Sequence, residues 1–294
     1  MFVGGGIVIG LALLAKRRLL KAPRKSPFTG AFLRPPGHTL SRQVDDAVGD
    51  VLALLMVGFA MPGVLVATVT TQSLISGNAI TRGNQIFYLI FAFLAVIGAW
   101  RRLSTAIGSV QRLRLGYEGE LAVGQELNQL MLAGYRVFHD FPADKFNIDH
   151  IVIGPNGVFA VETKARAKPD TGDGRKDALV VYDGQALKFP GWVEKEPLDQ
   201  AARQAQWLSK WLRSAVGEPV AVLPVLAVPG WFIDRKKSGP VFIYNGKNPE
   251  GLFRKVSGNP VDAPMIQRIA HQIEAKCRDV VPRAYAKEEP GKAS

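Results

Sequence analysis

The stretch NIDHIVIGPNGVFAVETK, residues 147–164, decides the fold of the second half of this 294-residue chain. Two apolar, β-like runs flank the tetrad GPNG at 154–157, and a Gly/Pro/Asn cluster between such runs is typical of a turn. The stretch is therefore predicted to form a β-hairpin. With a loop of two or four residues, Asp149 lies directly opposite Glu162.

The length of the loop decides which side chains share a face of the hairpin. With an even loop, Asn147 lies opposite Lys164, and alternation places Asp149, Glu162 and Lys164 on one face. A three-residue loop with a bulge at Gly157 would place Asp149 on the opposite face. The sequence leaves both loops open.

Two acids and a lysine on the packed face of a hairpin are costly to bury unless they pair or bind a cation. Two carboxylates about 5 Å apart suit one Mg²⁺ that keeps several of its waters. A neighbouring lysine can orient an attacking water, whose pKa the metal lowers while it neutralises charge on a phosphate. Asp149, Glu162 and Lys164 therefore suit phosphodiester hydrolysis. An internal salt bridge between Lys164 and one acid is the alternative, and the residues alone favour neither.

A helix is predicted before the hairpin, over residues 116–133 (GYEGELAVGQELNQLMLA), with Gly134 ending it. Glu120 lies on the apolar side of this helix, whereas Glu118 points roughly the other way. A carboxylate on a buried stripe must be paired or must bind a metal. Glu120 is thus either a third acid of the site or an acid at the edge of the stripe that meets a lysine.

Further strands and helices are expected around this core. Residues 135–140 are predicted to form a strand, residues 198–215 a helix, and residues 220–228 a buried strand in parallel pairing. The pair Asp183-Gly184 predicts a second hairpin over 177–189, which we expect to extend the edge of the sheet. The remaining expectations are a terminal amphipathic helix over 262–279, a loose tail from Pro282, and packing roles for Trp192, Trp207 and Trp211.

Three motifs, in this order, resemble the NERD (nuclease-related) domain: GYEGE at 116–120, the hairpin stretch at 147–164 and PLDQAARQ at 197–204. More broadly, Asp149 followed at a hairpin's distance by Glu162-Thr163-Lys164 is similar to the PD-(D/E)xK nuclease core. The resemblance runs from about Gly116 to about Val228. It implies a restriction-endonuclease-like α/β fold, with an αβββαβ core, a mixed sheet and a metal-dependent nuclease site.

Carried over residue by residue, the resemblance assigns roles to four positions. It implies Asp149 and Glu162 as metal ligands, Glu120 as the helix acid that completes the metal site, and Lys164 as the catalytic lysine. Mg²⁺ is the expected ion, and Mn²⁺ is also compatible because both accept carboxylate oxygen. The expected substrate is DNA, and the sequence does not distinguish it from RNA.

Three more polar residues are candidates for supporting the site or binding substrate. Gln200 matches the family's glutamine after the Pro-Leu step, and Gln204 follows one turn later. Arg166 continues the basic run past the site and could meet a phosphate. Ordinary polar helix surface for the glutamines, and a solvated strand end for Arg166, are the alternatives.

The N-terminal part has the composition of a membrane region. Residues 51–69 (VLALLMVGFAMPGVLVATV) are uncharged and would span about 28 Å as a helix, close to the hydrocarbon thickness of a bilayer. Residues 86–100 form a second, shorter run, and Trp100 with the following Arg101-Arg102 is typical of an interface anchor. A transmembrane hairpin is predicted, and two buried core helices are the alternative.

The distribution of charge predicts the orientation of this hairpin. Residues 1–115 hold 13 of the 37 Lys and Arg but only 3 of the 25 Asp and Glu. The basic loop 16–48 and everything after 101 are therefore expected in the cytoplasm, with the loop irregular and lying on anionic lipid. Residues 2–15 are either a short third span or a membrane-surface segment. The chain would then be a multi-pass protein of the cell membrane, with residues 116–294 as its cytoplasmic domain.

Cysteine and histidine usage narrows the function further. Cys277 is the only cysteine and no two of the four histidines have metal-ligand spacing, which excludes a disulfide framework and a cysteine-rich zinc site. The expected function is a membrane-anchored, metal-dependent nuclease that acts on DNA at the cytoplasmic face of the bilayer. A catalytically inactive nucleic-acid-binding or scaffold module, and a membrane protein of assembly or transport, are the alternatives. The sequence identifies no protein partner.

Overall fold

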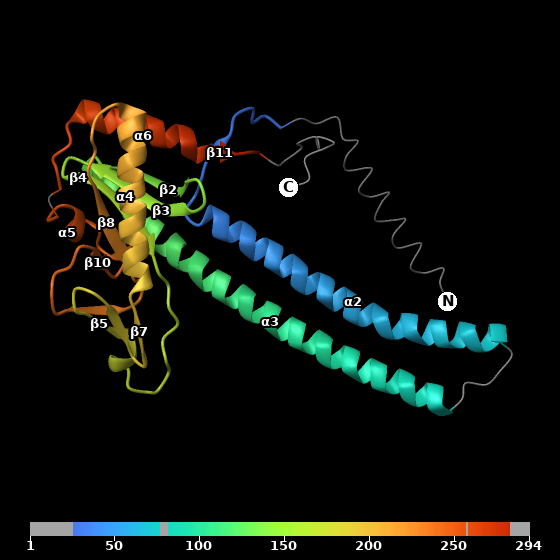
Figure 1. Ribbon diagram of the computed structural model, residues 1–294. Helices are drawn as coiled ribbons and strands as arrows, with labels where there is room; N and C mark the ends of the chain where they lie inside the picture. The colour runs from blue at the N-terminus through green and yellow to red at the C-terminus, as the bar shows by residue number, and fades with distance from the viewer. Residues whose placement is uncertain (1–25, 77–81, 257, 283–294) are drawn as a thin grey trace.

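The computed structural model describes residues 26–76, 82–256 and 258–282. A long helical hairpin projects from a domain in which helices cover a mixed β-sheet (Figure 1). The expected segment 2–15 and most of the tail after Pro282 lie outside the described residues. The α/β fold class predicted from the sequence is confirmed.

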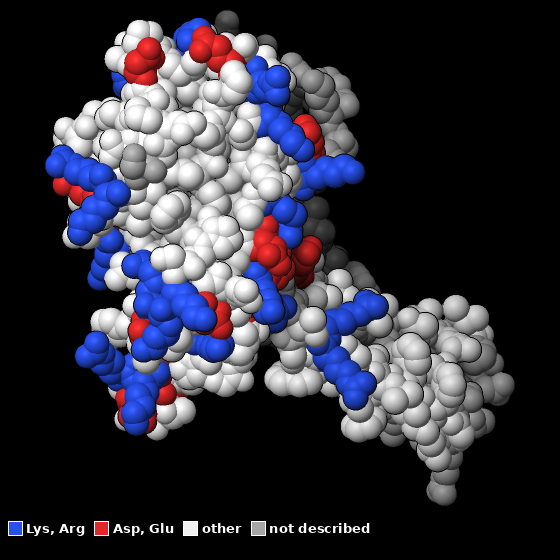
Figure 2. Space-filling view, turned by 60° about the vertical axis from the view of Figure 1, so that its left-hand side comes forward, with Lys and Arg blue, Asp and Glu red and all other residues white. Residues whose placement is uncertain are grey.

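The projecting hairpin consists of α2 (His38–Ser76) and α3 (Arg82–Asn128). Both helices are long and apolar enough to cross a bilayer, and 0% of the apolar window of each is buried. A core helix of a soluble domain would be mostly buried, so this exposure argues against the alternative of two core helices. In Figure 2, blue Lys and Arg side chains lie on the part of the projecting hairpin nearest the domain, at the lower right.

Helix α3 continues from the apolar run directly into the α/β domain. The helix expected over 116–133 is the last part of α3, followed by the 3₁₀ turn η1 (Gln129–Ala133). Gly134 ends it in the left-handed conformation, with φ of 85°. The boundary drawn at residue 115 therefore lies inside a helix rather than in a linker.

The segment before α2 differs from the irregular loop expected over 16–48, because α2 already begins at His38. Strand β1 (Phe32–Leu33) pairs with β11 (Arg278–Val280) at the other end of the described chain. The Arg34 guanidinium donates to Asp140 Oδ2 at 2.9 Å and to both carboxylate oxygens of Asp279 at 2.7 Å. This contact, which we call the N-terminal clamp, holds Arg34 and the residues around it on the domain, whereas residues 16–25 of the expected loop lie outside the described residues.

The main sheet has the strand order β10-β8-β4-β3-β2. The chain order α3-β2-β3-β4-α4-β8 is the expected αβββαβ core. The three consecutive strands pair antiparallel, whereas β8 pairs parallel with β4 and β10 pairs parallel with β8. The strands are β2 (Arg136–Pro142), β3 (Asn147–Gly154), β4 (Gly157–Thr163), β8 (Val222–Ala227) and β10 (Phe242–Tyr244).

The structure decides between the two loops that the sequence left open. Gly154 lies opposite Gly157 and Ile151 lies opposite Ala160, so the loop is the two residues Pro155-Asn156. Gly157 has φ of 138°, which few side-chain-bearing residues adopt. Any Cβ on Gly154 would collide with the Tyr135 ring. The even loop required for Asp149 and Glu162 to share a face is therefore present.

Helices cover both faces of the main sheet. Helix α3 packs on one face, where Val123 and Leu127 meet Phe159 and Val161. Helices α4 (Glu196–Val216) and α6 (Ala263–Cys277) pack on the other face. Asp262 caps α6 by accepting a hydrogen bond from the Met265 N–H at 2.8 Å. The α4 face is the one on which the sequence places Glu162.

The second hairpin forms its own sheet, so the expectation that it extends the main sheet edge is wrong. The order of this sheet is β7-β6-β5-β9, and β10 occupies the position beside β8 that the hairpin would have taken. The hairpin instead buries its apolar side against the start of α4 and Trp231. The strands are β5 (Leu179–Tyr182), β6 (Leu187–Phe189), β7 (Trp192–Glu194) and β9 (Phe232–Arg235), with the short helices η2 (Lys176–Ala178) and α5 (Glu250–Phe253) nearby.

The tryptophans have the packing roles expected from the sequence. Trp192 stacks on Phe189 with ring centres 4.7 Å apart, and Trp207 stacks on Trp211 at 6.4 Å. Phe141 contacts both of the latter rings. These rings join elements to one another.

The N-terminal clamp predicts an effect on the stability of the domain. Replacing Arg34 by Ala leaves the Asp140 carboxylate, whose side chain is 3% exposed, without its cation. We expect a loss of about 2–4 kcal/mol, because removing one partner leaves a buried charge uncompensated. Thermal unfolding of the full chain in detergent measures it. Arg268→Ala is the matched control, since the Arg268–Glu218 pair is exposed on both sides, and an equal loss there would contradict the prediction.

Candidate active site

The candidate site lies at the carboxyl end of β4. Glu162 is the penultimate residue of this strand and is buried, whereas Lys164 follows the strand and is partly exposed. The Lys164 ammonium donates to Glu162 Oε1 at 3.1 Å, and the backbone N–H of Lys164 donates to the Ala227 carbonyl oxygen at 2.8 Å. The backbone bond to β8 thus holds the lysine beside the acid.

Two glutamines of α4 complete this arrangement. Gln204 Nε2 donates to Glu162 Oε2 at 2.7 Å, and Gln200 Oε1 accepts from the Lys164 ammonium at 2.9 Å. Each oxygen of Glu162 therefore has one donor, and the lysine has two acceptors. The sequence left open whether these glutamines are ordinary helix surface. The structure places both side chains on Glu162 and Lys164, and Gln204 is itself buried.

Asp149 reaches the same strand end from β3. The β3–β4 ladder ends at His150 opposite Val161, and Asp149 Oδ2 accepts a hydrogen bond from the Thr163 N–H at 2.7 Å. The ladder stops before Asn147 can pair with Lys164. Asn147 instead donates to Thr39 Oγ1 at 2.6 Å, next to the N-terminal clamp.

Glu120 approaches from α3 and is 8% exposed. The glycine before it allows the approach: a Cβ on Gly119 would lie 2.6 Å from the Ala165 Cβ, which is closer than real side chains come. The GYEGE motif thus combines an acid with the small residue that lets the helix reach the end of β4.

Burial raises the pKa values of all three acids, and neighbouring carboxylates add to each rise. Burial, with the charges of Asp140 and Glu162, raises the pKa of Glu120 to about 8. Burial raises the pKa of Asp149 well above its usual value, and the charges of Glu162 and Glu120 add to this effect. Burial also raises the pKa of Glu162, and Lys164 opposes that rise. Three acids that destabilise one another's charged forms create a place where a cation is favourable.

Asp149 and Glu162 are the side chains that could hold a divalent ion needing few protein ligands. In the described residues, no group of three or more His, Cys, Asp or Glu side chains is arranged to hold a metal ion. Mg²⁺ usually keeps several waters and binds through one or two carboxylates. The fit therefore rests on Asp149 and Glu162, and the arrangement gives no support to Glu120 as a direct ligand.

Arg166 is engaged elsewhere. Its guanidinium binds the Glu194 carboxylate through two bonds of 2.9 Å, and its carbonyl oxygen accepts from the Trp231 indole at 3.1 Å. These contacts join the segment after β4 to the second sheet. Arg166 is thus neither a solvated strand end nor a free phosphate ligand.

The histidine of the Ile-Asp-His motif has a structural role. His150 Nδ1 lies 2.9 Å from His139 Nδ1, and His139 Nε2 lies 3.0 Å from Asn128 Oδ1. Burial lowers the pKa of His139 to about 4 and also lowers that of His150. The two rings form a neutral contact between β2, β3 and α3.

The sequence missed Asp140, which lies among the site's surroundings. It has φ of 49° and binds Arg34 and Thr39, and its charge raises the pKa of Glu120. Its partners in the clamp lie about a hundred positions away along the chain. No local pattern could identify a contact of that separation.

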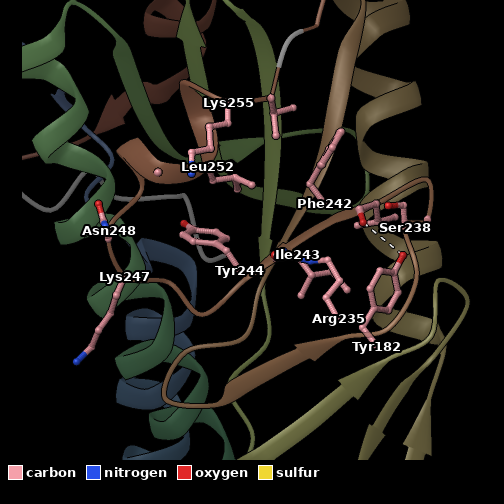
Figure 3. Close-up of a pocket in the computed structure, with 14 residues that line it drawn as sticks. Tyr182, Arg235, Ser238, Phe242, Ile243, Tyr244, Lys247, Asn248, Leu252 and Lys255 are labelled. Atoms are coloured by element: carbon pink, nitrogen blue, oxygen red, sulfur yellow. Dashed lines mark hydrogen bonds between the residues drawn. The ribbon is translucent and has the colours of Figure 1, made fainter.

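A separate pocket of about 470 Å³ lies beside β10 and α5 (Figure 3). The Tyr182 hydroxyl donates to the Val241 carbonyl oxygen at 3.4 Å within it. None of the site acids lines this pocket. Its labelled residues are Tyr182, Arg235, Ser238, Phe242, Ile243, Tyr244, Lys247, Asn248, Leu252 and Lys255.

Comparison with known families agrees with this geometry. Residues 115–229 match the family model of NERD, the nuclease-related domain, which spans α3 from Leu115, the sheet core, α4 and β8. The chain therefore contains a nuclease-related domain. No curated protein and no solved structure matches the chain.

The raised pKa of Glu120 predicts a pH dependence of stability without added metal. A group whose pKa is raised on folding stabilises the fold at low pH and loses that contribution as the pH rises through the folded value. Stability should therefore fall between about pH 4.5 and 8, and Glu120→Gln should flatten this fall. Thermal unfolding in EDTA across this range measures it. Glu118→Gln, on the exposed side of α3, is the control and should keep the wild-type slope of stability against pH. The prediction would be contradicted if Glu120→Gln and the wild type had the same slope.

The close approach at Gly119 predicts that Gly119→Ala destabilises the domain by about 1–3 kcal/mol, since inserted volume forces a shift in a packed region. Chemical denaturation of the full chain measures it. Gly108→Ala is the control on the same helix, because its nearest neighbour is the flexible end of Arg112 at 3.6 Å. That variant should be neutral or slightly stabilised by helix propensity. Equal effects at the two positions would refute the steric explanation.

Proposed function

We propose that this chain is a membrane-anchored, metal-dependent nuclease that hydrolyses phosphodiester bonds of DNA. The observation that carries the proposal is the cluster of three acids beside Lys164 at the end of β4, of which Glu120 and Glu162 are buried and all three have raised pKa values. A cluster of acids with only a structural role would lower the stability of the fold. A bound cation would neutralise these acids and could in turn bind a phosphate substrate. The nuclease-related domain over residues 115–229 supports the same chemistry.

The proposed roles follow from the contacts. Asp149 and Glu162 would hold Mg²⁺ or Mn²⁺, which supplies a water of lowered pKa and neutralises charge on the phosphate. Lys164 is partly exposed and held between Glu162 and Gln200, so its ammonium is placed to orient the attacking water. Gln204 holds the Glu162 carboxylate, and Gln200 holds the lysine. Glu120 lies near Glu162 and Lys164 on the α3 side.

A second function has one observation in its favour. The 3.1 Å contact between Lys164 and Glu162 is also what an internal salt bridge would give. A membrane-tethered module that binds nucleic acid without cutting it would keep this pair for stability alone. Turnover separates the two functions.

The anchoring part of the proposal rests on the two exposed apolar helices and on the charge around them. With Lys and Arg concentrated before α2 and after residue 100, the positive-inside rule places both ends of the hairpin in the cytoplasm. The domain would then act on nucleic acid at the inner face of the cell membrane.

The test uses the full chain in isolated membranes. The membranes are first washed with alkaline carbonate, which removes peripheral proteins, and the retained chain is then solubilised and purified. Supercoiled plasmid, linear single-stranded DNA and RNA are each incubated with Mg²⁺, Mn²⁺ or EDTA. We expect retention through the wash and metal-dependent cutting of DNA. Release by the wash would refute anchoring, and preferential cutting of RNA would refute the DNA assignment.

Two variants test the assigned roles. Asp149→Asn keeps the size of the side chain and an oxygen that can accept from the Thr163 N–H, so it should fold. We expect it, and Lys164→Ala, to lose at least about 100-fold in cleavage rate. Glu118→Gln, an exposed acid on α3, should cut at the wild-type rate. Folded wild-type protein that binds DNA but never cuts would favour the binding module instead.

A further inference from the structure

A groove of about 770 Å³ lies between α2 and α3, far from the candidate active site along both helices. It lies where the two apolar runs end: Asp50 directly precedes the run on α2, and Arg101 directly follows the run on α3. Because the two helices are antiparallel, with Tyr88 bonded to Gln72, Val57 lies about level with Arg101, and Asp50 lies about level with Ser109, about 10 Å nearer the domain along the helix axes. The lining residues are Asp50, Ala53, Leu54, Val57, Arg101, Arg102, Thr105, Ala106 and Ser109.

The charged end of the groove is cationic. Arg101 and Arg102 are both exposed, and neither guanidinium has an ion-pair partner in the part of the chain that the structure describes. Asp50 is the acid among the lining residues, so the lining has one net positive charge. Two unpaired guanidiniums favour a phosphate group, which Arg binds through paired hydrogen bonds.

The same end of the groove opens onto apolar surface. Val57 lies beside Arg101 on α2, and Leu54 lies between Val57 and Asp50 along that helix. This surface continues into the exposed apolar part of the hairpin, where Met56 is 68% and Ile97 38% exposed. A ligand that fits the groove therefore needs a phosphate near Arg101, a hydrocarbon chain that leaves the groove past Val57, and a polar group that reaches toward Asp50.

We propose that this groove binds one anionic phospholipid with a hydroxyl-bearing headgroup. The phosphate lies on Arg101 and Arg102, an acyl chain passes Val57 toward the exposed apolar surface, and a headgroup hydroxyl on the domain side donates to Asp50. Basic pockets between membrane helices on the cytoplasmic side recognise anionic headgroups by this chemistry. Asp50 disfavours a bare phosphomonoester, because like charges repel, but accepts from a glycerol hydroxyl. The inference rests on the anchoring part of the proposed function and is independent of nuclease turnover.

The test measures lipid binding by the purified full chain in non-ionic detergent. Native mass spectrometry titrates phosphatidylglycerol, phosphatidic acid and phosphatidylcholine separately. The wild type should bind phosphatidylglycerol most tightly. The double variant R101Q/R102Q should weaken that binding about tenfold or more, since each cation near a lipid surface contributes on the order of 1 kcal/mol, or about fivefold.

Matched variants decide between a site and diffuse charge. R112Q/R114Q removes the same charge from exposed positions of α3 outside the groove and should bind phosphatidylglycerol within about twofold of wild type. Asp50→Asn should narrow the preference for phosphatidylglycerol over phosphatidic acid. The proposal would be overturned if both double variants weakened phosphatidylglycerol binding equally. It would also be overturned if the wild type bound phosphatidylcholine, or soluble glycerol phosphate, as tightly as phosphatidylglycerol. Nuclease activity is not read, so a failure here is distinct from a failure of the proposed chemistry.

Discussion

The two-residue turn at Pro155-Asn156 sets the register on which the candidate site depends. Side chains alternate between the faces of a strand, so a slip of one residue would move Asp149 to the α3 face. Gly157 adopts a φ of 138° at this turn, and Gly154 leaves room for the Tyr135 ring. With this register, the Asp149 carboxylate meets the Thr163 N–H at the end of β4.

The candidate active site buries carboxylates, which are rarely found in the core of a protein. Glu120 and Glu162 are buried, burial raises the pKa of each, and their charges disfavour one another. The surrounding sheet is apolar on both faces and packed by helices, so it can tolerate this local cost. Hydrogen bonds from Gln204 and Thr163 hold two of the carboxylates in place before any ligand arrives. Such preorganisation is what a binding or catalytic site requires.

Helix α3 connects the apolar hairpin to this site without interruption. Arg101, at the end of the apolar run, and Glu120, at the site, lie on the same helix, about 28 Å apart along its axis. The N-terminal clamp binds the start of α2 to the domain through Arg34 and Asp140. Both helices of the hairpin are therefore attached to the domain, and the composition change near residue 115 marks no structural boundary.

Patterns of short range were sufficient for much of this protein. The turn tetrad determined the hairpin, the spacing of Asp149, Glu162 and Lys164 determined the candidate chemistry, and the uncharged runs determined the hairpin of apolar helices. These features depend on neighbours in the sequence, through alternation along a strand or length along a helix.

Only the tertiary structure decided the rest. In it, Gln200 and Gln204 contact the site residues Lys164 and Glu162. Arg166 pairs with Glu194, and the second hairpin forms a sheet separate from the main one. The tertiary structure also joined Arg34 to Asp140, across about a hundred residues. These contacts depend on which surfaces meet when helices and sheets pack. A local pattern carries no information about a partner so distant along the chain. The sequence therefore determined the residues of the site, and tertiary packing determined which other residues contact them.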